Sequence, residues 1–282
     1  MLAGSGCPAR MTAHSGMPMT YHPYNAHGWR GCIEDGWQAP LADLDAWLAE
    51  NPGERLVDQP SREVRRIETG QGTVYAKIFH QGSNARGLRQ IPDALKWYLR
   101  PSRALAILRI SQALLDAGFA CPVPVLAARR HSKTGWPKDL FISHECGSAP
   151  LSQRLQSLSG RTKINSLLAT VAAQLHRFHR AGFVHGDCSP ENLALTDAGV
   201  LVLFDNDRTV RRPWRPRTHA QRRSLANFGM RLTMEIQDLA PFREFLARYA
   251  AAAQWTPEQA DRETHLVMAL AQKRLRAKGL VL

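Results

Sequence analysis

The chain has 282 residues, of which 44% are hydrophobic and 22% are charged, and its formal net charge is +13. This is the composition of a folded globular protein with room for one large domain or two lobes, and it excludes an intrinsically disordered chain. No apolar run approaches the roughly 18 residues of a membrane-spanning helix, and the first residues hold no continuous apolar segment like that of a secretory signal. We therefore expect a soluble, cytoplasmic protein.

The cysteines indicate the compartment of the protein, and the arginines indicate the class of its partners. The five cysteines are widely spread and include no C-x-x-C pair, which argues against a disulfide framework or a zinc site and favours a reducing compartment. Arginine outnumbers lysine by thirty to seven. Since a guanidinium binds carboxylates and phosphates through paired hydrogen bonds, the excess favours acidic partners such as nucleic acid, anionic lipid head groups or a phosphorylated substrate. A general compositional bias toward arginine would produce the same excess.

The first part of the chain is predicted to be a tail followed by strands. Residues 1–28 are predicted to be a flexible tail. Residues 29–50 combine an extended piece with an amphipathic helix that ends at N-P-G. Residues 62–79 hold two β-rich runs around T-G-Q-G, which predict a hairpin. Lys77 lies in the second run, where a lysine is costly unless its ammonium group reaches a partner or water.

Further elements follow before the character of the chain changes. A helical pattern over residues 97–118 ends at a glycine, and two strands are predicted at 121–130 and 139–145. Glycine and proline near residues 147–150 then indicate a linker. The region before this linker is therefore rich in strands and contains one long helix.

The second part of the chain is mainly helical. Hydrophobic residues recur at helical spacing over residues 161–180. The segment V-H-G-D-C-S-P-E-N-L-A-L at 184–195 leads into two short strands joined by T-D-A-G, and from about residue 219 the pattern is helical to the end. The sequence therefore predicts an α+β fold, with a strand-rich lobe at 29–147 and a helical lobe at 148–282.

Three polar side chains in the second lobe have the spacing that phosphoryl transfer requires. Asp187 and Asn192 lie five residues apart, and Asp205 follows Asn192 by thirteen residues at the end of an apolar strand. Such a reaction needs a carboxylate that accepts the substrate hydroxyl proton, oxygen ligands for magnesium, and a lysine that neutralises phosphate charge. Lys77 is placed for the last of these roles. Each signal alone is weak, because aspartate is also an ordinary turn residue.

These motifs resemble those of the protein-kinase-like fold. V-Y-A-K corresponds to the strand lysine motif, H-G-D-C-S-P-E-N to the catalytic loop and D-N-D to the metal-binding element. More specifically, F-V-H-G-D-x-x-x-x-N-L, L-F-D-N-D-R-T-V-R-R and L-L-D-A-G-F-A-C-P-V-P-V are similar to segments of the lipopolysaccharide core kinases, the Kdo and heptose kinase family. The resemblance covers roughly residues 64–232. It implies a bilobal fold with a small nucleotide-gripping sheet lobe and a helical catalytic lobe.

The resemblance also implies roles for individual residues. Asp187 would be the catalytic base, Asn192 and Asp205 would hold Mg²⁺, and Lys77 would contact the phosphates of ATP. His185 is expected to brace the catalytic loop. Cys188 is expected to be a small buried side chain and not a nucleophile, because no protease-type or metal-type cysteine signature accompanies it. Glu191 is expected to face solvent, with a position near the metal as the alternative.

Three features depart from the kinase pattern, two in the sheet lobe and one in the helical lobe. The helix after the strand lysine carries no glutamate, and Ile107 stands at the aligned position. Either Asp93 would substitute from an earlier position, or Lys77 would pair with phosphate alone. The segment before Arg62 has no glycine for a phosphate loop, and Asn206 replaces the usual phenylalanine. A non-catalytic kinase fold that serves as a binding module therefore stays open. So does a small-molecule phosphotransferase of the antibiotic or choline kinase type.

The segment 208–223 bears on the substrate, because it contains seven arginines and no acidic residue. Arg208, Arg211 and Arg212 are predicted to bind an anionic acceptor, such as the carboxylates or phosphates of a lipopolysaccharide core. A solvated basic loop is the alternative, and nucleic acid is not expected because Trp214 is the lone aromatic residue there. The sequence thus predicts an ATP- and Mg²⁺-dependent sugar kinase at the inner face of the inner membrane, without an obligate protein partner.

Overall fold

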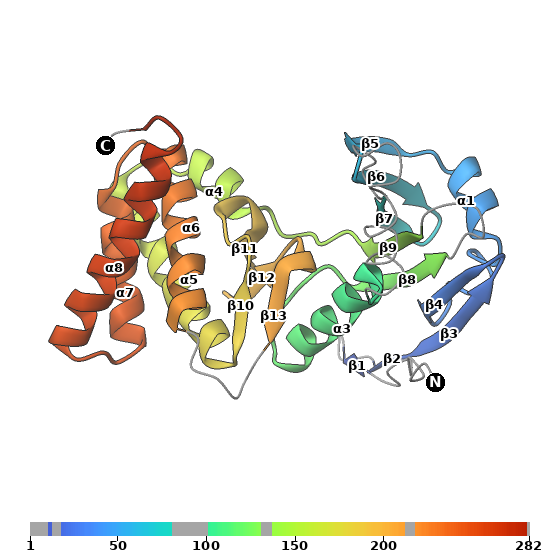
Figure 1. The fold of residues 1–282 in the computed structure, drawn as a ribbon, viewed down its shortest axis with the longest axis horizontal. Coiled ribbons are helices and arrows are strands. Elements are labelled where there is room, and N and C mark those ends of the chain that lie inside the picture. The colour runs from blue at the N-terminus through green and yellow to red at the C-terminus, as the bar shows by residue number, and fades with distance from the viewer. Residues whose placement is uncertain (1–10, 13–17, 81–100, 131–136, 212–217, 281–282) are drawn as a thin grey trace, which may run out of the picture. The chain divides into compact units, whose positions relative to one another are not determined.

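The computed structural model describes residues 11–12, 18–80, 101–130, 137–211 and 218–280. The chain divides into two compact units. The first comprises Met1–Asp116 and Pro122–Cys146, and the second comprises Ala117–Cys121 and Gly147–Leu282. Figure 1 labels the elements of both units, whose order changes from mostly strands to mostly helices along the chain.

The first unit is built on an antiparallel seven-stranded sheet, with the strand order β3-β4-β8-β9-β7-β6-β5. Its strands are β3 (Tyr21–Ala26), β4 (Trp29–Glu34), β5 (Glu54–Gln59), β6 (Arg62–Thr69), β7 (Gly72–Phe79), β8 (Pro124–Arg130) and β9 (Lys138–His144). The predicted hairpin is confirmed as the β6–β7 pair, whose register runs from Arg62 opposite Phe79 to Thr69 opposite Gly72. Two short strands, β1 (Met11–Thr12) and β2 (Pro18–Met19), pair with each other before this sheet.

Both edges of the sheet differ from the prediction. The tail expected over residues 1–28 is shorter, because Tyr21–Ala26 forms the edge strand β3. Tyr21 and Tyr24 are buried, and their hydroxyls donate to the carbonyl oxygens of Pro124 at 2.6 Å and Leu41 at 2.7 Å. A proline within a short polar run looks irregular in sequence, yet an edge strand tolerates it because one side of the strand has no partner. The opposite edge strand, β5, was not predicted either. It is mostly exposed, so its sequence lacks the alternation of hydrophobic and polar residues that marks a half-buried strand.

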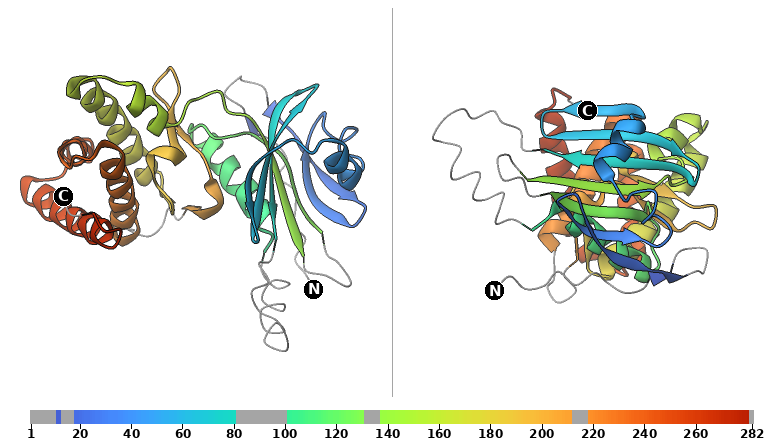
Figure 2. Two further views of the ribbon diagram at one scale, coloured as in Figure 1. Left: turned by 90° about the horizontal axis from the view of Figure 1, so that it is seen from above. Right: turned by 90° about the vertical axis from the view of Figure 1, so that its right-hand side faces the viewer.

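Two helices of the first unit pack on the sheet. The helix α1 (Leu44–Glu50) begins at Asp43, whose carboxylate accepts a hydrogen bond from the amide of Ala46. Its buried residues Leu44 and Trp47 join the hydrophobic cluster formed by the sheet. The longer α3 (Arg103–Asp116) packs against β8 and β9, as the left view of Figure 2 shows.

A buried ion pair fixes the start of α3. Asp139 is fully buried and accepts two hydrogen bonds from the guanidinium of Arg129, at 2.8 and 2.9 Å. It also accepts from the hydroxyl of Ser102 at 2.8 Å and from the amide of Arg103 at 2.9 Å. Because these buried donors share one carboxylate, loss of Asp139 would break a buried ion pair, which is strongly destabilising.

The second unit is mainly helical. Its helices are α4 (Leu151–Ser157), α5 (Arg161–Arg180), α6 (Thr218–Ile236), α7 (Ala240–Ala252) and α8 (Pro257–Arg276). The helix predicted over residues 161–180 is confirmed as α5, and the helical end of the chain is confirmed as α6 to α8. Only α4 was not predicted, and its seven residues are too few to show a clear helical period.

Short strands and turns of the second unit carry the catalytic motifs. The strands β10 (Phe183–His185) and β13 (Thr209–Arg211) pair, as do β11 (Leu193–Leu195) and β12 (Leu201–Leu203). Two single 3₁₀ turns, η1 (Pro190–Asn192) and η2 (Asn206–Arg208), lie at the ends of these strands. Buried phenylalanines hold the elements together, and they are Phe119, Phe178, Phe183, Phe228, Phe242 and Phe245.

Candidate active site

The loop from His185 to Asn192 is closed by its own hydrogen bonds. The side-chain amide of Asn192 donates to the carbonyl oxygen of Asp187 at 2.9 Å, and the backbone amide of Asn192 donates to that of Ser189 at 3.0 Å. Cys188 is fully buried between them, and burial raises the pKa of its thiol to about 12. The thiol is therefore protonated and does not act as a nucleophile, whereas Asp187 is held on a fixed backbone.

His185 braces this loop through both nitrogens of its ring. Its Nε2 lies 2.9 Å from the carbonyl oxygen of Phe204, and its Nδ1 lies 3.1 Å from the backbone amide of Asp187. A carbonyl only accepts and an amide N–H only donates, so the ring is neutral with its hydrogen on Nε2. Burial lowers the pKa of this histidine below its usual value of 6.5 and keeps it in that form.

Asp205 stands at the end of β12, next to the catalytic loop. The backbone amide of Phe204 donates to the carbonyl oxygen of Asn192 at 2.9 Å, which joins the two segments. The carboxylates of Asp205, Asp187 and Asp207 all act electrostatically on His185. The structure thus brings Asp187 and Asp205 close to one buried imidazole, and Asn192 is hydrogen-bonded to both of their segments.

The turn after β12 is shaped by Asn206. Asp205 has the left-handed conformation, with φ 49° and ψ 55°, which asparagine and aspartate tolerate better than most residues. The buried amide of Asn206 donates to the carbonyl oxygen of Leu203 at 2.9 Å and accepts from the hydroxyl of Thr209 at 3.0 Å. Asn206 therefore stabilises this turn by hydrogen bonds, where a kinase phenylalanine would act by apolar packing.

The donor set at this position suits magnesium. Asn192 uses its side-chain nitrogen within the loop, which leaves its oxygen as the atom for a metal, and Asp205 supplies a carboxylate. Mg²⁺ is commonly held by one or two such protein oxygens, with phosphate oxygens and waters completing its shell. Within the residues that the structure describes, no group of three or more His, Cys, Asp or Glu side chains forms an all-protein metal site. The residues present fit a nucleotide-bound Mg²⁺.

Lys77 lies in the other unit, on β7. Val74, Ala76 and Ile78 of this strand join the cluster around α1, so the alternation of side chains places Lys77 on the opposite face together with Phe79. That face is covered by α3, since the guanidinium of Arg103 lies 4.7 Å from the centre of the Phe79 ring.

In the first unit, the structure agrees with two departures from the kinase pattern, which are the missing helix glutamate and the missing glycine-rich loop. Ile107 is buried on α3, and the one acidic residue of that helix is Asp116 at its end. The turn between β5 and β6 consists of Pro60 and Ser61, because Gln59 lies opposite Arg62 in the register. Asp93, the substitute partner for the lysine, lies outside the described residues.

The predicted substrate arginines begin beside the catalytic loop. The backbone amide of Gly186 donates to the carbonyl oxygen of Arg208 at 3.2 Å. A Cβ at position 186 would lie 2.7 Å from that oxygen, which explains why H-G-D replaces H-R-D here. The exposed Arg211 places its guanidinium 5.1 Å from the centre of the Phe183 ring. Arg212 lies outside the described residues.

The end of the basic segment 208–223 is helical, as predicted for the chain from about residue 219. This end belongs to α6, and Arg222 forms a two-pronged ion pair with Glu263 at 2.6 and 2.7 Å. This arginine is therefore occupied within the fold.

Two residues of α6 that the sequence did not single out make hydrogen bonds to the catalytic loop. The side-chain amide of Asn227 donates to the Oδ1 atom of Asp187 at 3.2 Å and to the carbonyl oxygen of Cys188 at 2.8 Å. The hydroxyl of Ser224 donates to the carbonyl oxygen of His185 at 3.2 Å. The signal available in the sequence was a pair of small polar residues, three apart, on an otherwise apolar helix face.

The buried His179 should make the free energy of unfolding depend on pH. His179 is fully buried, its Nδ1 lies 2.8 Å from the hydroxyl of Tyr249, and burial lowers its pKa from 6.5 to about 3. The unfolded chain takes up a proton at this residue below about pH 6.5, whereas the folded chain does not. The free energy of unfolding should therefore be highest above pH 6.5 and fall as the pH drops toward 3, by up to about 1.4 kcal/mol per pH unit for each such histidine.

Urea unfolding at several pH values checks this expectation. The variant His179→Gln keeps an amide for the Tyr249 hydroxyl but cannot titrate, so its stability should fall less steeply on acidification. Parallel curves for the two proteins would show that His179 is not responsible.

Comparisons with known proteins agree with the motifs. The model of the family described as "Lipopolysaccharide kinase (Kdo/WaaP) family" matches residues 45–261, and no curated protein matches the sequence. Among solved structures, the MAP kinase LmaMPK10 from Leishmania major aligns with 16% identity over 80% of this chain and 73% of that chain, with a TM-score of 0.42. The bifunctional kinase-methyltransferase WbdD aligns with 16% identity over 76% of this chain and 50% of that chain, with a TM-score of 0.43. The family match spans the catalytic loop and ends within α8.

Proposed function

We propose that this chain, which belongs to the lipopolysaccharide kinase (Kdo/WaaP) family and is a kinase, phosphorylates a sugar hydroxyl of the lipopolysaccharide inner core. The acceptor sugar would be Kdo or heptose. The observation that carries this proposal is that Asp187 and Asp205 lie close to His185, while Asn192 is hydrogen-bonded to Asp187 and Phe204. The two aspartates and the asparagine are the side chains that a phosphoryl transfer requires, and they are held in a fixed local geometry.

Each residue would have a separate task in the transfer. Asp187 orients the sugar hydroxyl and accepts its proton as the oxygen attacks the γ-phosphorus of ATP in line. Asn192 and Asp205 would hold Mg²⁺, which neutralises charge on the phosphates when it is bound. Lys77, on the sheet unit, would contact the phosphates as a further positive charge.

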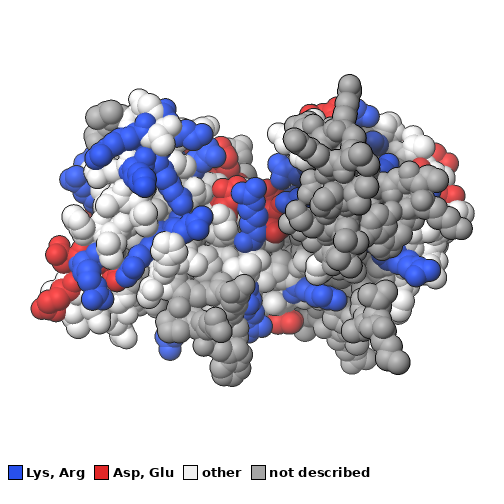
Figure 3. All heavy atoms as spheres, viewed as in Figure 1, with Lys and Arg blue, Asp and Glu red and all other residues white. Residues whose placement is uncertain are grey.

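The arginines next to the loop would bind the acidic sugar. Arg208 and Arg211 are exposed, and the hydrogen bond from Gly186 ties Arg208 to the residue before Asp187. We assign Arg212 to the same group. Figure 3 shows many further Lys and Arg side chains on the visible face of the second unit, which suits an anionic glycolipid substrate.

Contact with the inner membrane would come from the substrate and from this basic surface. No helix among the described residues has the length and hydrophobicity to cross a bilayer. A peripheral position on the inner face of the inner membrane is therefore part of the proposal.

Phosphate transfer from labelled ATP tests the proposed acceptor. Purified protein is incubated with Mg²⁺, ATP labelled at the γ-phosphate and lipopolysaccharide cores of defined structure. Label should enter a core that carries Kdo and heptose, and a core truncated after Kdo distinguishes the two sugars. Choline and an aminoglycoside are included as small acceptors, because labelling of these alone would overturn the lipopolysaccharide assignment. ATP binding without transfer to any acceptor would support the binding-module alternative.

A further inference from the structure

Asn227 on α6 connects the proposed catalytic aspartate to the last helix of the chain. On one side its Nδ2 atom donates to the Oδ1 atom of Asp187 at 3.2 Å and to the carbonyl oxygen of Cys188 at 2.8 Å. On the other side its Oδ1 atom accepts from the Nη1 atom of Arg274 at 3.2 Å. The side chain is thus the middle of a chain of hydrogen bonds that runs from α8 to the catalytic loop.

The chemistry of Arg274 fixes which way the Asn227 amide faces. A guanidinium only donates, so the amide oxygen of Asn227 must face Arg274 and the amide nitrogen must face Asp187. The turned-over amide would place its oxygen against a carboxylate and a carbonyl and its nitrogen against the guanidinium, and both contacts would be repulsive. Arg274 therefore adds to the preference for the orientation in which Asn227 donates to Asp187, and it holds the side chain there.

Arg274 is itself held in place. It is half-buried, and its Nη1 atom also donates to the carbonyl oxygen of Arg223 at 3.3 Å. Burial and the nearby Arg223 lower the pKa of this guanidinium, yet an arginine remains charged in proteins at neutral pH. The group is a permanent donor.

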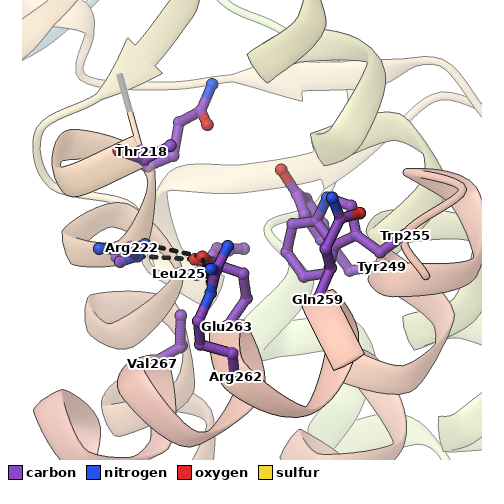
Figure 4. Close-up of a pocket in the computed structure, with 10 residues that line it drawn as sticks. Thr218, Arg222, Leu225, Tyr249, Trp255, Gln259, Arg262, Glu263 and Val267 are labelled. Carbon is purple, nitrogen blue, oxygen red and sulfur yellow. Dashed lines mark hydrogen bonds and ion pairs between the residues drawn. The ribbon is translucent and has the colours of Figure 1, made fainter. Parts of the chain in front are cut away.

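The helix α8 is anchored on α6 at a second point, which Figure 4 shows. Glu263 on α8 accepts the two hydrogen bonds from Arg222 at 2.6 and 2.7 Å beside a pocket of about 270 Å³. The hydrogen bond from Arg222 lowers the pKa of the Glu263 carboxyl, so the pair stays charged. The start of α8 is also fixed, by a capping box between Thr256 and Gln259.

We propose that Asn227 and Arg274 form a positioning relay, in which Arg274 on α8 orients Asn227 and Asn227 holds the Asp187 carboxylate for proton transfer. The relay leaves the second oxygen of Asp187 for the substrate hydroxyl. It rests on the proposed role of Asp187. Arg274 lies beyond residue 261, where the family match ends, so the relay makes the C-terminal helix part of the catalytic machinery of this chain.

The relay predicts unequal effects on kcat and KM. Around metal sites, removal of a hydrogen-bonding partner that orients a ligand costs about 10- to 100-fold, and we expect a similar cost for Asp187. Asn227→Ala should lower kcat by about that factor with little change in the KM for ATP, and Arg274→Ala should lower it by about tenfold. Arg274→Lys should recover part of the loss, since an ammonium also only donates. Arg276→Ala, at an exposed position in the same turn, should leave the rate unchanged.

A double variant separates a relay from a general loss of structure. In the relay, Arg274 acts only through Asn227, so Arg274→Ala should have no further effect on kcat in an Asn227→Ala background. Thermal unfolding of each variant, measured alongside, reports the contribution of α8 docking to stability. The relay would be overturned if the fold-loss of kcat in the double variant equalled the product of the losses in the two single variants. It would also be overturned if Asn227→Ala kept the wild-type kcat.

The rate is followed as ATP consumption, with and without lipopolysaccharide, so that a wrong acceptor does not hide the result. A wild-type protein that hydrolyses ATP but labels no lipopolysaccharide contradicts the proposed acceptor and still permits the comparison of variants. A wild-type protein that consumes no ATP contradicts both the proposed function and the relay that rests on it.

Discussion

Asp187→Asn is expected to lower the kcat for phosphate transfer by about 10²- to 10⁴-fold, the usual contribution of a general base. The amide of asparagine keeps the shape of the side chain but cannot accept the hydroxyl proton. Since the backbone of residue 187 is held by its hydrogen bonds with His185 and Asn192, the substitution should not unfold the loop. ATP affinity should change little, which equilibrium binding of a labelled nucleotide measures beside the transfer rate.

The matched control is Asp197→Asn, at an exposed aspartate in the turn before β12. It removes the same charge from the same unit and should leave the rate unaltered. If Asp187→Asn retained the wild-type kcat, the proton acceptor would have to be another group, and the role assigned to this loop would be wrong.

Asp205→Asn should remove the magnesium-dependent part of ATP binding and lower turnover by at least about a hundredfold, because a bound metal supplies several kcal/mol of charge stabilisation. Position 205 has a left-handed backbone, with φ 49°, and asparagine tolerates this conformation. The substitution therefore changes the ligand without straining the turn. A loss of function can then be assigned to the missing carboxylate charge.

Thermal unfolding with ATP, in the presence and absence of Mg²⁺, measures this effect. A ligand at 100 times its dissociation constant stabilises a protein by about 2.7 kcal/mol, so wild type should gain stability from ATP when Mg²⁺ is present. Asp205→Asn should lose the Mg²⁺-dependent gain, and Asp197→Asn should retain it. An equal gain for wild type and Asp205→Asn would exclude Asp205 as a metal ligand.

Elements with strong local signals could be predicted from the sequence. The hairpin of β6 and β7 surrounds a T-G-Q-G turn, and α5 carries a regular hydrophobic face over twenty residues. The H-G-D loop and the D-N-D turn were found because their residues lie close together in the chain. Signals of this kind do not depend on distant contacts.

Features set by distant contacts could not be predicted. The edge strand β3 owes its order to Tyr21 and Tyr24, whose hydroxyls bond to carbonyls far along the chain. Asn227 follows Asp187 by forty residues and Arg274 follows Asn227 by forty-seven. On a helix each appears as one more polar residue, and its partners come only from the packing of α6 against the loop after β10 and of α8 against α6.

Mass spectrometry of lipopolysaccharide from cells tests whether the inner core is the phosphate acceptor. Cells that carry the gene are compared with cells that lack it and with cells that carry the Asp187→Asn variant. The proposal predicts that the inner core of the last two is lighter by about 80 mass units, the mass of one transferred phosphoryl group, and that the wild-type gene restores it. An unchanged core mass in cells without the gene would contradict the account.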